Sequence, residues 1–251
     1  MSVLAVFLLA LGVADLARAE RRLPTRRHAV IAAGVGVAVL VVVGALAGLG
    51  GRGDVVLLVL AGLVLVAWVL VSDLAMHTGR WGLAALGGLA VGVGAMLAFS
   101  GYATPAGGSL ESWQHWTGFP VLAGKPTDRI LLVAGLFMIQ FATGNIVVRL
   151  VLASVGAIKP LGQPQASDRL KGGRLLGPME RVFIVGLGLA GEFTAAGIVI
   201  AAKGLIRWPE LQARSQESGG VGIDEITEYF LVGSFVSWLV ALASLGLVTA
   251  T

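Results

Sequence analysis

The residues best suited to chemistry in this sequence are a few charged side chains inside or beside long apolar runs. Glu192 lies twelve residues after Glu180, about 18 Å along a helix, in one such run. A carboxylate near the middle of a bilayer is costly, and such a group commonly carries a proton or binds a cation. The alternatives are a protonated carboxyl group bonded to a neighbouring helix, or a helix that ends before Glu192.

Charged pairs also mark the ends of the last two apolar runs. Lys203 and Arg207 are four residues apart, so they share a helix face, and Glu225 and Glu228 share a face at the start of the last run. If these two helices are antiparallel neighbours, the basic pair meets the acidic pair at the outer surface. The pairs then form either a binding site or simple ion pairs at snorkelling helix ends.

The apolar run before these carries polar residues of its own. Asn145 and Arg149 are spaced i, i+4, and Gln140 and Thr143 precede them. Polar side chains in an apolar helix usually bind neighbouring helices, and a substrate cleft is the alternative.

The usual signs of catalysis, metal binding and cofactor binding are missing from the sequence. The chain has no cysteine, and its three histidines, at 28, 77 and 115, lie in separate segments. Closely spaced glycines lie within apolar runs rather than after strands, which argues against a dinucleotide site. The sequence therefore predicts no catalytic residue, no metal and no cofactor, and favours a protein that is not an enzyme.

Composition indicates a membrane protein. Of 251 residues, 57% are hydrophobic and only 13% are charged, which excludes a soluble enzyme, a disordered tail and a nucleic-acid binder.

We expect an all-α, polytopic integral membrane protein with one domain, 1–251. It comprises four helices in 1–101, an outer loop in 102–129 and three helices in 130–251. The seven expected spans are Val3–Ala17, Ala29–Leu49, Val55–Val71, Trp81–Phe99, Ile130–Val155, Met179–Ala202 and Ile226–Val248. Asp54 is the expected N-cap of the third, and Leu110–Trp116 is expected to form a short interfacial helix.

The basic residues predict the orientation. Arginines follow the first run rather than preceding it, unlike in a secretory signal, so we expect a retained helix with its N-terminus outside and the C-terminus in the cytoplasm. The 203–214 segment, with three basic residues, fits this poorly unless 203–223 is re-entrant rather than an outer loop. The expected location is the bacterial cytoplasmic (inner) membrane.

Four stretches carry a family resemblance. They are Asn145-Ile-Val-Val-Arg149, Gly173-Arg-Leu-Leu-Gly-Pro-Met-Glu180-Arg181, Ala201-Ala-Lys203-Gly-Leu-Ile-Arg207 and Thr227-Glu228-Tyr-Phe-Leu-Val-Gly233. Over about 130–247 the chain resembles a bacterial inner-membrane family known only by a domain-of-unknown-function label. The resemblance implies that one constellation contains Glu180, Arg181, Lys203, Arg207 and Glu228. That family usually has Glu at the position of Thr194 and an amide at that of Glu192.

We therefore predict a non-enzymatic transport component or a subunit of a membrane complex. The alternatives are an enzyme or carrier acting on lipid-linked substrates, and a proton- or cation-coupled transporter that uses Glu192. Expected partners are anionic lipid headgroups at the basic inner loops, and other proteins or a second copy packed through Gly-rich helices. The candidate ligand- or lipid-binding residues are Asn145, Arg149, Glu180, Arg181, Glu192, Lys203, Arg207 and Glu228.

Overall fold

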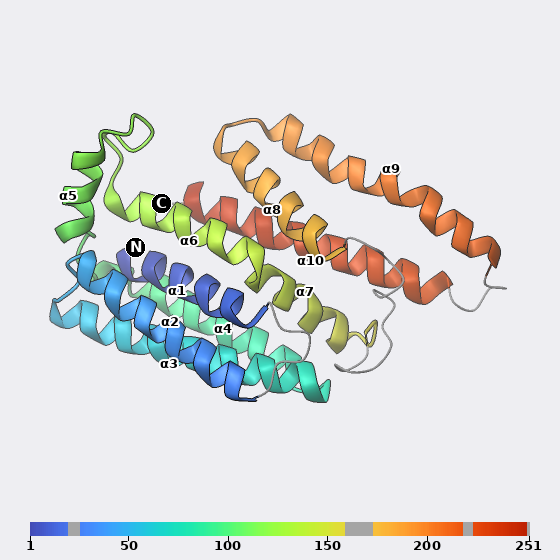
Figure 1. Cartoon of the computed structure of the whole chain (residues 1–251), viewed down its shortest axis with the longest axis horizontal. Coiled ribbons are helices and arrows are strands. Elements are labelled where there is room, and N and C mark those ends of the chain that lie inside the picture. The colour runs from blue at the N-terminus through green and yellow to red at the C-terminus, as the bar shows by residue number, and fades with distance from the viewer. Residues whose placement is uncertain (20–25, 159–172, 218–222, 250–251) are drawn as a thin grey trace.

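The chain folds into a bundle of long helices, as a computed structural model shows (Figure 1). The structure describes residues 1–19, 26–158, 173–217 and 223–249, and it contains no strand within these ranges. The elements in chain order are α1 (Ser2–Ala19), α2 (Arg26–Leu46), α3 (Arg52–Thr78), α4 (Gly82–Ala98), the 3₁₀ helix η1 (Ser100–Tyr102), α5 (Gly108–Thr117), α6 (Thr127–Phe141), α7 (Thr143–Ser154), α8 (Gly173–Leu189), α9 (Phe193–Glu217) and α10 (Ile223–Thr249).

Four helices in the described part of the chain are long and apolar enough to cross a membrane. They are α1, α2, α3 and the 228–249 part of α10. A fifth is obtained if α6 and α7, which meet at a bend of 49°, count as one span. The all-helical prediction is confirmed, and the apolar helices are those of a membrane protein, but this count does not confirm seven spans.

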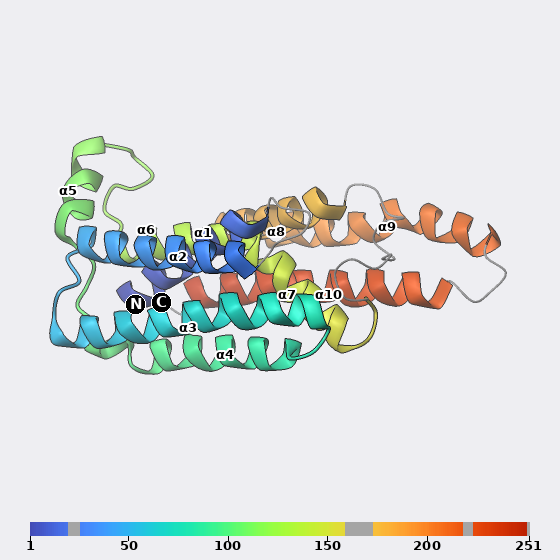
Figure 2. The same cartoon turned by 60° about the horizontal axis from the view of Figure 1, so that its bottom comes forward.

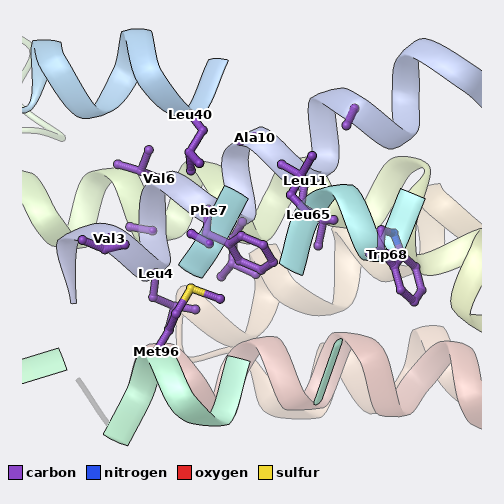
Figure 3. Close-up of a cluster of buried hydrophobic side chains, with 14 of the residues drawn as sticks. Val3, Leu4, Val6, Phe7, Ala10, Leu11, Leu40, Leu65, Trp68 and Met96 are labelled. Carbon is purple, nitrogen blue, oxygen red and sulfur yellow. The ribbon is translucent and has the colours of Figure 1, made fainter. Parts of the chain in front are cut away.

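Helix α1 lies at the centre of the N-terminal bundle. Buried residues make up 72% of its apolar window, against 33% in α2 and α3. Figure 3 shows Phe7 and Leu11 of α1 beside Leu65 of α3, with Met96 of α4 near Leu4. Glycine lets α6 approach closely, because a Cβ atom at Gly135 would lie 2.9 Å from the main-chain oxygen of Ala5.

A buried ion pair holds the end of α1 to α3. Arg18 donates to Asp15 Oδ1 through Nε (3.0 Å) and Nη2 (2.5 Å), and Trp68 Nε1 donates to Asp15 Oδ2 at 3.0 Å. The remaining guanidinium contacts are to Ser72 Oγ and the main-chain oxygen of Val69. Asp15 is fully buried and Arg18 nearly so. Removing either side chain would therefore leave the other charge buried without its partner, which destabilises the fold.

At the end of the bundle near α5, the carboxylate of Asp54 binds both the start of α3 and a neighbouring segment. Asp54 is the third residue of α3 rather than its N-cap, which is Gly51; its Oδ2 accepts from the Gly51 N–H at 2.9 Å. Its carboxylate also accepts from the main-chain N–H and the hydroxyl of Thr104, both at 2.7 Å. These bonds tie the segment before α5 to α3. The short helix expected at 110–116 is present as α5.

The prediction of one continuous helix over Met179–Ala202 is wrong. The chain turns back at 190–192, so α8 and α9 form a helical hairpin rather than one span (Figure 1). Gly191 is left-handed (φ 82°), and the N–H of Glu192 bonds to the carbonyl of Leu187, which together end α8 as a Schellman motif.

Because of this hairpin, the start of α1 and the end of α10 lie near each other. Both figures of the whole chain show the N- and C-terminal labels close together at the same side of the bundle (Figures 1 and 2). Val248 of α10 belongs to the same buried cluster as Val3 and Leu4 of α1. Seven full crossings would place the two ends on opposite sides, so this arrangement does not confirm the predicted seven spans or the predicted orientation.

Candidate functional site

The break between α6 and α7 is filled by a charged side chain from α8. In a continuous helix the carbonyl of Gln140 would accept the N–H of Gly144. Here it accepts from Arg181 instead, at 3.1 Å from Nε and 2.6 Å from Nη2. Arg181 also donates to Asn145 Oδ1 at 2.8 Å and to Ser237 Oγ at 2.9 Å. With 1% exposure, it is a fully buried cation whose hydrogen bonds here go to neutral acceptors.

The packing around this guanidinium is tight. A Cβ atom at Gly144 would lie 2.6 Å from Arg181 Nε, so only glycine leaves room for the side chain. Gln140 Nε2 donates to Ser244 Oγ of α10 at 2.9 Å, while Gln140 Oε1 and Thr143 Oγ1 are buried without a hydrogen-bond partner. The broken span thus brings α6, α7, α8 and α10 together around polar atoms.

Glu180, the residue before Arg181, binds one partner on α9 and one on α10. Its Oε2 accepts from Lys203 Nζ of α9 at 2.5 Å, and its Oε1 accepts from Trp238 Nε1 of α10 at 2.6 Å. Lys203 Nζ also lies 5.9 Å from the centre of the Trp238 ring, within the range of a cation–π interaction. Lys203 therefore pairs with Glu180, whereas the sequence analysis expected it to meet Glu225 and Glu228.

The structure brings together half of the predicted site residues. Glu180, Arg181, Lys203 and Asn145 form one polar cluster, which we call the hairpin cluster together with Gln140, Ser237 and Trp238.

The other predicted residues lie around or beyond the hairpin cluster. Arg149 is half-buried one turn after Asn145. Glu192 is exposed at the turn between α8 and α9, not within a continuous helix. Glu228 is exposed ten residues before Trp238, about 15 Å along α10. The side chains of Arg207 and Glu225 are outside the described part of the structure.

Trp238 and Ser237 are the cluster residues that the sequence analysis did not select. No local pattern marks them, because both lie in an ordinary apolar stretch, and only the packing of α10 against α8 gives them charged neighbours. Gln140 was noted as a polar residue, but its main-chain role at the break has no signature in the sequence.

The hairpin cluster contains groups that can bind charged ligands. The described residues contain no group of three or more His, Cys, Asp or Glu placed to hold a metal ion. A cavity of about 180 Å³ lies elsewhere, between α3, α4 and α7, and its lining is mostly apolar. The hairpin cluster, in contrast, combines a guanidinium, an ammonium, a carboxylate and an indole ring beside the break between α6 and α7.

Comparison with known proteins adds no relative. No family model, no curated protein and no solved structure matches the chain. The resemblance to an uncharacterised bacterial membrane family therefore stays a prediction.

Proposed function

We propose that this chain is a non-enzymatic transport component of the bacterial cytoplasmic membrane, with the hairpin cluster as its binding site. The observation that carries the proposal is that the break between α6 and α7 lies beside a buried cluster of charged residues supplied by the α8–α9 hairpin. Discontinuous helices that expose backbone groups and helix ends to polar partners are a recurring way to build substrate sites in transporters. A protein that served only as a membrane anchor would gain nothing from burying Arg181 and Glu180 there.

The distribution of basic residues supports an orientation. Arg18, Arg26, Arg27 and Arg80 lie where α1 meets α2 and where α3 meets α4, and we assign this end to the cytoplasm. The opposite end carries Arg52, Lys125 and Arg129. Since α9 runs back along α8, the basic residues of 203–214 come to the cytoplasmic side, which removes the difficulty they posed for an outer segment. Both ends of the chain then face outward.

A transport site must be reached by water from at least one side, and this property can be tested without knowing the substrate. The chain has no cysteine, so a single thiol reports on one position. We would introduce Ser237→Cys, 4% exposed beside Arg181, into the full-length protein in membranes. The membrane-impermeant anionic thiol reagent sulfonatoethyl methanethiosulfonate would then be applied from each side. The neighbouring guanidinium favours the reactive thiolate.

Leu239→Cys is the matched control, because this position is on the same helix and 48% exposed on the apolar surface. We expect the thiol at 237 to be modified from one or both sides and the thiol at 239 to be protected by lipid. Protection of both thiols from both sides would overturn the transport proposal. It would leave the charges as internal ties of a structural subunit.

A further inference from the structure

The partners of Glu180 have the chemistry of an ammonium-binding site. A carboxylate and an aromatic face together recognise ammonium groups, the first by a charge-assisted hydrogen bond and the second by a cation–π contact. Glu180 provides the carboxylate and Trp238 the ring, and the indole N–H fixes the carboxylate at 2.6 Å. The ammonium group in this site belongs to Lys203, 2.5 Å from Glu180 Oε2 and 5.9 Å from the ring centre.

The surroundings of Glu180 are largely apolar. Glu180 is only 8% exposed, and the neighbouring apolar cluster contains Ile184, Val185, Ala241 and Leu245, with Val199, Ile200 and Trp238 packed against it. In such surroundings a charge-assisted contact is stronger than at a water-exposed surface. Arg181 does not take the carboxylate, because the guanidinium contacts described above are directed to Gln140, Asn145 and Ser237.

Lys203 is the part of the site that can leave. It belongs to α9, which packs chiefly on α8 and α10 and runs along the outer edge of the molecule (Figure 1). Its side chain is 22% exposed, and its flexible four-carbon stem allows the ammonium group to move while the helix stays in place. Glu180 and Trp238, in contrast, are fixed to each other.

We propose that Glu180 and Trp238 bind an alkylammonium group, and that Lys203 occupies their site as an internal ligand until such a group displaces it. This inference rests on the proposed transport function, for which it names the substrate class. The group is a protonated amine, either of a small soluble molecule or of a lipid headgroup such as that of phosphatidylethanolamine. No bond is made or broken in the exchange.

The test uses the full chain in nanodiscs of phosphatidylglycerol, with Lys203→Ala to empty the site. The probe is methylammonium chloride, measured by calorimetric titration and by the thermal unfolding temperature, with sodium chloride at equal ionic strength as reference. We expect the variant to bind methylammonium at least about tenfold more tightly than the unchanged protein, since Lys203 no longer competes. Adding Glu180→Gln to the variant should abolish binding, and Lys125→Ala, at an exposed lysine of the outer loop, should behave as the unchanged protein.

A second arm identifies the source of the amine. Nanodiscs containing phosphatidylethanolamine should raise the unfolding temperature of Lys203→Ala, without added methylammonium, if the ligand is a lipid headgroup. A rise with methylammonium alone identifies a soluble amine. If Lys203→Ala is too unstable to purify, Lys203→Met retains most of the stem and takes its place.

The proposal is overturned if neither methylammonium nor phosphatidylethanolamine raises the unfolding temperature of Lys203→Ala or Lys203→Met. It is also overturned if adding Glu180→Gln leaves that rise intact. Lys203 would then be a fixed structural partner of Glu180. These outcomes are independent of thiol modification at position 237, so failure of ammonium binding and failure of the transport proposal can be told apart.

Discussion

Arg181 donates two hydrogen bonds to the main-chain oxygen of Gln140, where a continuous helix would have used the N–H of Gly144. A side chain from α8 thus replaces a backbone donor of α7. The exchange explains how α6 and α7 can bend by 49° without leaving this carbonyl unpaired in an apolar bundle. It also makes the bend dependent on α8.

Arg181→Lys should weaken the bundle although the charge is retained. A lysine ammonium cannot reproduce the planar fork that serves Gln140, Asn145 and Ser237 together. We expect a loss of about 2 kcal/mol, the scale of one or two hydrogen bonds to a charged group. Thermal unfolding in detergent, followed by tryptophan fluorescence, measures it. Arg80→Lys, at an exposed position, is the control, and equal losses in both variants would contradict the proposed role of Arg181.

Gly144→Ala should displace the Arg181 guanidinium. The added methyl group would lie 2.6 Å from Nε, too close for any real contact, and the guanidinium has backbone and side-chain partners that restrict its retreat. We expect destabilisation of roughly 1–3 kcal/mol from overpacking. Gly186→Ala, where a Cβ atom meets nothing within 4 Å, should not lower stability. Comparable unfolding temperatures for the two variants would show that α8 is not held against α7 in this way.

Asp15→Ala and Arg18→Ala should each destabilise the N-terminal bundle by roughly 3–5 kcal/mol, because either change leaves a buried charge without its partner. The double variant should lose much less than the sum of the two single losses. Unfolding temperatures of the four proteins complete the cycle. Additive losses would mean that Asp15 and Arg18 act independently, with Trp68 and Ser72 providing enough compensation for each.

The hairpin predicts that both ends of the chain face the same side of the membrane. A reporter fused after Thr251 should be active as alkaline phosphatase, which requires export, and dark as green fluorescent protein, which requires the cytoplasm. A fusion after Gly156, at the end of α7, should show the opposite pattern. Cytoplasmic fluorescence from the fusion after Thr251 would restore the topology expected from the sequence and exclude α8–α9 as a hairpin.

Much of the architecture follows from the order of residues alone. Apolar runs long enough to span a bilayer identified α1, α2, α3 and α10, because the cost of exposing backbone polar groups to lipid permits little except helices there. The turn at Gly191 could also have been predicted. A glycine at the C′ position ends helices, but within an apolar run this signal was outweighed by hydropathy, which does not register chain reversal.

The pairing of charges was decided by the tertiary structure. Lys203 was expected to meet Glu228 because a continuous helix would carry it to the far surface; the reversal at 190–192 places it beside Glu180 instead. No proline marks the break at Ala142. The donor that stabilises it, Arg181, lies some forty residues further along the chain. Sequence specifies which groups are costly to bury, but only the packed helices determine which partners relieve that cost.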